Sequence, residues 1–200
     1  MEIILHIGTY KTGTQSIQIF LIKNRQKLLE RYSVLYPKTG IVYNGHHLLA
    51  FDLYDRYKNS FGTEIDINEV FRALFNEINL NTPNAVVISS EDFSFLRKDQ
   101  LVKLRKMLRN GINKIICYIR RQDILTESMY AQLVKTYDVR FKKTFNEFIL
   151  DRNFIEKFNF YNLFSRWREV FPEAKIIPRI YDRKLFPEGN VILDFLSVLG

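Results

Sequence analysis

The 200-residue sequence has one cysteine, Cys117, and no long hydrophobic run. A lone cysteine excludes an intrachain disulfide and is typical of proteins from reducing compartments. The apolar run at residues 2–7 is far shorter than the ~20 residues of a membrane-spanning helix. No basic segment precedes it, as one would in a secretory leader. We therefore expect a cytoplasmic chain without an integral membrane segment.

Basic clusters and metal-binding patterns are also scarce. The formal net charge of +8 favours anionic partners, but the positive charges are dispersed and form no run of five. The sequence thus lacks the basic stripe or recognition helix of a nucleic-acid-binding domain. The three histidines, His6, His46 and His47, have no cysteine or carboxylate at the spacing of a metal site. We expect neither a nucleic-acid partner nor a bound metal.

Segments with strand and helix character alternate along the whole chain. Strands are expected at residues 2–7, 33–37, 84–89, 113–119 and 174–181. Helices are expected at residues 14–31, 46–57, 67–80, 98–111, 120–137, 154–171 and 190–200, with another from about Phe145. No repeat, low-complexity segment or linker interrupts this alternation. The pattern predicts one α/β domain over residues 1–200, a three-layer α/β/α arrangement with a mainly parallel central sheet.

Polar residues follow three of these strands and mark a candidate ligand site. They are residues 8–16, residues 89–92, and the pair Arg120 and Arg121. Ligands of open parallel sheets bind beyond the carboxyl ends of the strands. We therefore expect these three segments to converge on one edge of the sheet.

The segment GTYKTGTQS after the first strand has the glycine spacing of a phosphate-binding loop. Gly8 and Gly13 allow the backbone to approach a ligand, and the amides that open the next helix attract anions. Thr14 and Ser16 add hydroxyl donors. In a nucleoside triphosphatase a lysine follows the second glycine, whereas here Lys11 lies inside the loop. That position suits a single 5′-phosphate that carries one further transferable group.

This loop resembles the 5′-phosphosulfate-binding loop of sulfotransferases that use 3′-phosphoadenosine-5′-phosphosulfate (PAPS). Lys11, Gly13 and Thr14 match the lysine, glycine and threonine of that family. The family also binds the 3′-phosphate through an arginine at a strand end and a serine eight residues later, which Arg120 and Ser128 match. The resemblance covers most of the chain and is closest to bacterial members that modify carbohydrates. It implies a P-loop NTPase-like sulfotransferase fold.

Members of that family continue beyond a helix similar to the last one here, so the resemblance implies a domain truncated at its C-terminus. It also implies in-line transfer of a sulfuryl group to a hydroxyl, with Lys11 stabilising the departing nucleotide oxygen. The implied donor site consists of Gly8, Thr9, Tyr10, Lys11, Thr12, Gly13, Thr14, Gln15, Ser16, Arg120 and Ser128. The expected acceptor is a saccharide or a glycolipid.

An acceptor hydroxyl needs a general base. Glu91, directly after the strand at residues 84–89, is the first candidate, although a carboxylate at a helix start is also favoured by the helix dipole alone. His46 or His47 is the second candidate, because histidine titrates near neutrality. The sequence leaves this choice open.

Two other functions compete with sulfuryl transfer. A small-molecule kinase would use a similar loop with ATP and magnesium, but it needs a lysine after the second glycine, where Thr14 and Gln15 follow Gly13 here. A non-catalytic nucleotide- or glycan-binding module would keep the loop without turnover.

Overall fold

The computed structural model describes residues 1–50, 66–109, 111–136, 141–151 and 156–199. Its centre is a five-stranded sheet of β1 (Glu2–His6), β2 (Val34–Leu35), β3 (Ala85–Ser89), β4 (Lys114–Ile119) and β5 (Lys175–Ile180). The strand order is β2-β3-β1-β4-β5, and every neighbouring pair is parallel. The predicted α/β class and parallel sheet are therefore confirmed.

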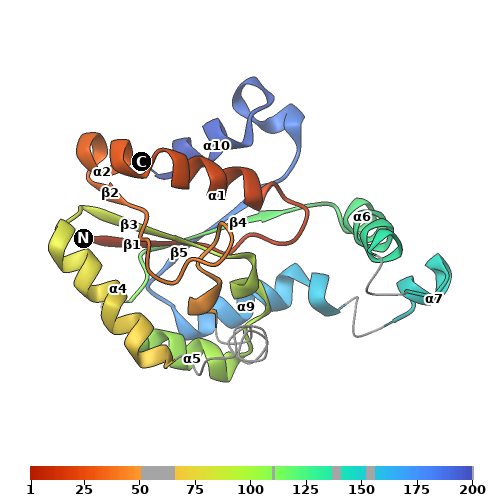
Figure 1. The fold of residues 1–200 in the computed structure, drawn as a ribbon. Helices are drawn as coiled ribbons and strands as arrows, with labels where there is room; N and C mark the ends of the chain where they lie inside the picture. The colour runs from red at the N-terminus through yellow and green to blue at the C-terminus, as the bar shows by residue number, and fades with distance from the viewer. Residues whose placement is uncertain (51–65, 110, 137–140, 152–155, 200) are drawn as a thin grey trace.

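Helices cover both faces of this sheet (Figure 1). The α-helices are α1 (Thr14–Lys23), α2 (Arg25–Tyr32), α4 (Ile67–Asn81), α5 (Lys98–Met107), α6 (Gln122–Lys135), α7 (Phe145–Ile149), α9 (Phe160–Val170) and α10 (Val191–Leu199). Short 3-10 helices are η1 (His47–Leu49), η2 (Glu91–Phe95), η4 (Glu156–Phe158), η5 (Arg183–Leu185) and η6 (Pro187–Gly189). Helices α1, α2 and α10 lie on one face, and α4, α5 and α9 lie on the other. No helix in the described ranges is long and apolar enough to cross a membrane.

Two helices predicted in the N-terminal part of the chain differ from the structure. The helix predicted at residues 14–31 divides at Asn24, whose side-chain amide donates to the carbonyl of Phe20 at 2.9 Å. Asparagine competes in this way with the hydrogen bonds of a regular helix. The helix predicted at residues 46–57 begins as the 3-10 helix η1, and its residues from 51 onward lie outside the described ranges.

A third predicted helix begins later than expected. The helix predicted at residues 154–171 becomes α-helical only at Phe160. Asn159 explains this start, because its side-chain oxygen accepts a hydrogen bond from the backbone N–H of Asn162 at 3.0 Å. Asparagine is among the strongest helix N-caps.

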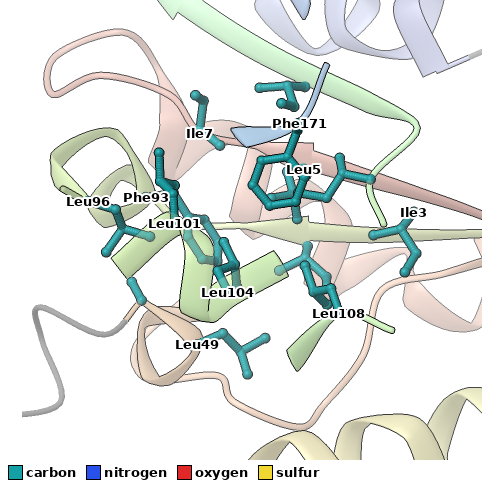
Figure 2. Packing of buried hydrophobic residues seen from close by; sticks show 14 of the residues in the cluster. Ile3, Leu5, Ile7, Leu49, Phe93, Leu96, Leu101, Leu104, Leu108 and Phe171 are labelled. Carbon is teal, nitrogen blue, oxygen red and sulfur yellow. The ribbon is translucent and has the colours of Figure 1, made fainter. Parts of the chain in front are cut away.

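The apolar residues of β1 are buried on both faces of the sheet. Ile3 and Leu5 pack into the cluster that joins the sheet to α4, α5 and α9 (Figure 2), whereas Ile4 packs toward α1 and α10. Leu101 and Leu104 of α5 complete the first cluster. Strands buried on both faces need continuous apolar runs, and each fully buried aliphatic side chain contributes ~1.5–3 kcal/mol. This burial fixes the position of the loop that follows β1.

The topology brings the three polar segments to one edge, as predicted. β1 lies between β3 and β4, and the register pairs His6 with both Ser89 and Ile116, so the carboxyl ends of the three strands lie near one another. The chain leaves β1 for α1 on one face, whereas after β4 it runs through α6 and α7 before α9 packs on the other face. Such a divergence between neighbouring parallel strands is where open α/β sheets bind ligands.

Candidate functional site

A cleft of about 520 Å³ opens at this edge of the sheet. The predicted phosphate-binding loop and the start of α1 supply Thr9, Tyr10, Lys11, Gly13, Thr14, Gln15, Ser16 and Gln18. More distant segments supply Tyr43, Asn44, His47, Glu91, Gln132 and Tyr181. The volume lies within the ~300–1,000 Å³ of small-molecule sites. The lining is mainly polar and includes the rings of Tyr10, Tyr43 and Tyr181.

Two threonines of the loop tie its backbone in place. The hydroxyl of Thr9 donates to the carbonyl of Tyr118 on β4 at 3.0 Å, and that of Thr12 donates to the carbonyl of Thr9 at 2.5 Å. Both side chains are buried, so their hydroxyls stabilise the loop itself. Lys11 is exposed in the cleft, has a left-handed backbone (φ 64°), and forms no ion pair with another described residue. The loop thus presents to the cleft a cation, Lys11, that is unpaired among the described residues.

The first turn of α1 retains donors for an anion. Gly13 (φ 75°) is the N-cap and supplies no side-chain hydrogen bond. The hydroxyl of Thr14 is buried and has no hydrogen-bond partner within the described residues, although Thr14 lines the cleft. Backbone amides and a hydroxyl at a helix N-terminus are the groups that bind phosphate. The loop therefore fits a phosphate group.

Gly8 is required by the tight packing below the loop. A Cβ atom at this position would lie 2.4 Å from Thr14 Oγ1 and 3.0 Å from His6 Nε2. His6 is fully buried, its Nδ1 lies 2.8 Å from Ser89 Oγ, and its Nε2 has no partner within the described residues. Burial lowers the pKa of His6 to about 3, so the ring is neutral. An uncharged, buried His6 thus packs beneath the loop at Gly8.

Arg120 and Ser128 lie beside the cleft rather than in its lining. The guanidinium of Arg120 stacks over the ring of Tyr181 at 5.9 Å, and a Cβ atom on Gly13 would lie 2.7 Å from that ring. Tyr181 therefore connects Arg120 to the loop. Ser128 is one helical turn before Gln132, a lining residue of α6, and residues four apart share a helix face.

The neighbouring Arg121 is engaged elsewhere. Its guanidinium pairs with Asp123 at 2.5 Å, and both side chains are exposed. Arg120 forms no ion pair or hydrogen bond within the described residues, so its donors are available. The two arginines therefore differ: Arg121 is paired with Asp123, whereas the guanidinium of Arg120 lies over Tyr181, a lining residue of the cleft.

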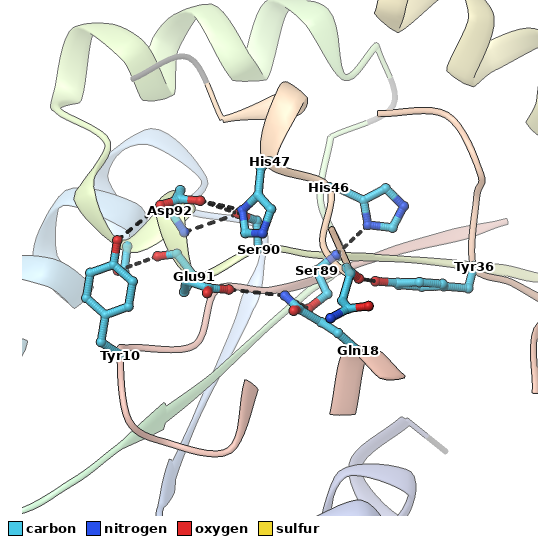
Figure 3. A network of polar contacts seen from close by, with 11 residues as sticks. Tyr10, Gln18, Tyr36, His46, His47, Ser89, Ser90, Glu91 and Asp92 are labelled. Carbon is cyan, nitrogen blue, oxygen red and sulfur yellow. Dashed lines mark hydrogen bonds and ion pairs between the residues drawn. The ribbon is translucent and has the colours of Figure 1, made fainter. Parts of the chain in front are cut away.

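On the β3 side of the loop, His47 is held by Asp92 (Figure 3). Its Nδ1 lies in hydrogen-bond contact with Asp92 Oδ2 and 2.8 Å from Ser90 Oγ. The hydroxyl of Tyr10 donates to the other oxygen of Asp92 at 3.3 Å. Burial alone lowers the pKa of His47, but the hydrogen bond and the negative charge of Asp92 outweigh it, so the pKa is raised. The ring lines the cleft with Nδ1 committed to Asp92.

His46 has a different environment from its neighbour. It is fully buried, its Nδ1 accepts the backbone N–H of Ser89 at 3.1 Å, and its Nε2 lies 3.1 Å from the carbonyl of Pro37. Burial lowers the pKa of His46 to about 4, against smaller opposing effects of these hydrogen bonds. His46 is not part of the cleft lining. The geometry therefore favours His47 over His46 for contact with a substrate.

Glu91 lines the cleft at the start of η2. Its carboxylate accepts a hydrogen bond from the side-chain amide of Gln18 at 3.1 Å, and the same amide donates to Ser89 Oγ at 3.3 Å. The side chain is half-buried, with its carboxylate on the same side of the loop as His47. The β3 side of the cleft thus contains two groups that can accept a proton.

No protein-family model matches the sequence. Over 115 residues the chain is 49% identical to an uncharacterized protein of Archaeoglobus fulgidus, a match that covers 58% of this chain and 30% of that protein. The matched part is thus less than a third of the relative's length. This similarity carries no functional information.

Several residues of the cleft are absent from the sequence-based site. Gln18 had a usable signal, because a polar residue four positions after Thr14 falls on the buried face of α1. No sequence signal could have found Tyr43, Gln132 and Tyr181, since their segments show no pattern that indicates a ligand. They enter the site only through the tertiary fold.

Proposed function

We propose that the chain is a PAPS-dependent sulfotransferase that transfers a sulfuryl group to a hydroxyl acceptor. One observation carries this proposal: a single cleft contains the ammonium of Lys11, the start of α1 with a Thr14 hydroxyl that has no partner among the described residues, and two proton acceptors, His47 and Glu91. Transfer of a sulfuryl group needs these parts and requires little covalent chemistry from the protein.

The donor would be bound from two ends. The loop amides and the Thr14 hydroxyl would hold the 5′-phosphate, and Arg120 with Ser128 would bind the 3′-phosphate through charge-assisted and neutral hydrogen bonds. The bound donor supplies the activated sulfuryl group. The exposed ammonium of Lys11 would stabilise the negative charge on the departing phosphate oxygen.

The acceptor proton would pass to His47. Its Nδ1 is fixed by Asp92, which leaves Nε2 as the atom that takes the proton. The acceptor oxygen forms a bond to sulfur as the bond from sulfur to the phosphate oxygen breaks, so the hydroxyl proton ends on His47 and the negative charge on the nucleotide product. Glu91, the first candidate from the sequence, would hydrogen-bond the acceptor from the same side.

Calorimetry tests the donor site. The purified chain is titrated with 3′,5′-ADP, 5′-AMP and ATP with magnesium, and we expect tight binding of 3′,5′-ADP alone. Arg120→Ala should lose about 10- to 100-fold in affinity for 3′,5′-ADP and little for 5′-AMP, as expected for one charge-assisted contact. Arg121→Ala is the matched control, because Arg121 pairs with Asp123 and should leave both affinities unchanged.

Other outcomes point to the competing functions. Preferential binding of ATP with magnesium would indicate a kinase and refute the proposal. Binding of 3′,5′-ADP without transfer of label from radioactive PAPS to any member of a glycan and glycolipid panel would indicate a non-catalytic module. Transfer to a panel member, abolished by Lys11→Ala with nucleotide binding retained, is the result that we expect.

A further inference from the structure

The cleft has two halves, one on each side of the phosphate-binding loop. β3 and β4 flank β1, so the lining residues that approach from the end of β3 lie on the opposite side from those near β4. Tyr43, Asn44, His47 and Glu91 form the β3 half, because their segments are bonded to the end of β3. Gln132 and Tyr181 belong to the β4 half. Since the proposed 3′-phosphate site is on the β4 side, the β3 half remains for the acceptor.

A rigid turn presents Tyr43 to this half. The backbone groups of Val42 and Gly45 bond each other in both directions, at 2.9 and 3.2 Å, and close the turn. The carbonyl of Asn44 accepts a hydrogen bond at 3.0 Å from the hydroxyl of Tyr36, whose ring is fully buried. A Cβ atom on Gly45 would lie 2.6 Å from the amide of Gln18. The turn is therefore fixed against the wall of the cleft.

The turn fixes the backbone of Tyr43, while its side chain is exposed. Its side chain is 80% exposed although it lines the cleft, and its backbone is left-handed with φ 55°. Side-chain-bearing residues adopt this conformation uncommonly, and such positions cluster at ligand sites. Its ring contacts no other aromatic ring among the described residues. The ring face is therefore available to a ligand at the rim.

The chemistry around Tyr43 is that of a neutral sugar site. One face of a pyranose ring consists of C–H bonds and can lie flat on an aromatic ring, while its edge carries hydroxyls. The amide of Asn44 and the carboxylate of Glu91 supply acceptors and a donor for such hydroxyls. The described lining of the β3 half includes no lysine or arginine, and its histidine, His47, is paired with Asp92. The described residues of this half therefore offer no free cation to an acidic sugar.

We propose that the β3 half of the cleft is the acceptor subsite and that it binds a neutral sugar residue stacked on Tyr43. This inference rests on the proposed sulfotransferase function, because that function assigns the β4 half to the nucleotide. Asn44 and Glu91 orient the sugar hydroxyls toward His47, and Lys11 lies in the loop between the two halves.

The test measures sugar and nucleotide binding separately. Chemical-shift titrations follow methyl glycosides of neutral hexoses and the matching uronic acids, with the chain free and saturated with 3′,5′-ADP. The variants are Tyr43→Ala, Tyr43→Phe and Tyr161→Ala. Tyr161 of α9 is equally exposed (80%) and is no part of the cleft lining, so it is a matched control for loss of a surface tyrosine.

We expect a neutral glycoside to bind at least about fivefold more tightly than its uronic acid. Tyr43→Ala should weaken that binding about tenfold or more, with Tyr43→Phe and Tyr161→Ala close to wild type and the affinity for 3′,5′-ADP unchanged. Unchanged sugar binding in Tyr43→Ala refutes the subsite. Loss of nucleotide affinity in Tyr43→Ala also refutes it and assigns the ring to the adenine base. Sugar binding that depends on Tyr43 in a chain with no affinity for 3′,5′-ADP would support the subsite and refute the proposed function.

Discussion

Acidification from pH 6.5 to pH 5.0 is expected to destabilise the folded chain through two buried histidines. Burial lowers the pKa of His6 to about 3 and that of His46 to about 4. An unfolded histidine titrates near a pKa of ~6.5. Below that pH the unfolded chain binds two protons that the folded chain does not bind, so the stability present above it is lost as the pH falls.

The size of the loss follows from these pKa values. Over this range each histidine costs roughly 1.6 kcal/mol of unfolding free energy, so the two together cost about 3 kcal/mol. His47 acts in the opposite direction, because its pKa is raised. The stability that His47 contributes is fully present below its pKa in the unfolded chain and is lost as the pH rises through its pKa in the folded chain. This contribution therefore changes little between pH 6.5 and pH 5.0. A loss of this size is a large part of the ~5–15 kcal/mol of a typical domain.

Urea unfolding at a series of pH values provides the assay. Trp167, the single tryptophan, is fully buried and reports unfolding by fluorescence. His46→Asn keeps an acceptor for the backbone N–H of Ser89 and should halve the pH dependence. NMR titration of the three histidine rings gives a second measurement, in which two rings stay neutral to pH 5.0. A loss below about 1 kcal/mol, or three rings that titrate near a pKa of 6.5, would refute the buried, neutral state of His6 and His46.

Three further predictions concern the base and the last helix. His47→Ala should lower turnover by about 10²–10⁴ with nucleotide affinity retained, and Glu91→Gln should have a smaller effect, whereas the reverse order would assign the base to Glu91. Because a base must be deprotonated, activity should rise with pH through the raised pKa of His47, and Asp92→Asn should move that rise to lower pH. Asp194 of α10 is fully buried, accepts the hydroxyl of Tyr118 at 2.6 Å and pairs with Arg179. Asp194→Ala should therefore lower the unfolding free energy by about 2–4 kcal/mol, measured by Trp167 fluorescence, while Ser197→Ala on the next turn should change it by less than about 1 kcal/mol.

The sheet could be predicted because strands buried on both faces need continuous apolar runs, and such runs are visible in the sequence. Residues 3–5 of β1 and 115–118 of β4 form runs without polar alternation, and these side chains are buried on both faces of the sheet. The positions where helices begin and end were harder to predict, because a single side chain can determine each of them. Asn24 and Asn159 each redirect a local hydrogen bond, and neither interrupts the apolar period that predicted one longer helix.

The loop of the candidate site was predictable for a different reason: its properties are local. Its glycines, its cation and the helix behind it are contiguous in sequence, so their spacing carries the information. The proton acceptors were not predictable to the same degree. His47 and Asp92 are 45 residues apart, and only the fold brings them together. His46 and His47 are adjacent in sequence, yet one is enclosed by backbone groups and the other faces the cleft.

A reaction that moves a group between two large substrates needs both to meet at one point, and the strand order provides such a point. β1 is central, and its loop carries Lys11 between the segments that follow β3 and β4. In the proposed reaction the nucleotide and the sugar would therefore approach from opposite sides and share only the loop. Substitutions on the β3 side should then change the acceptor without changing donor affinity, and those on the β4 side should do the converse. The contrast between Tyr43 and Arg120 variants measures that separation directly, and equal effects of both on one ligand would contradict it.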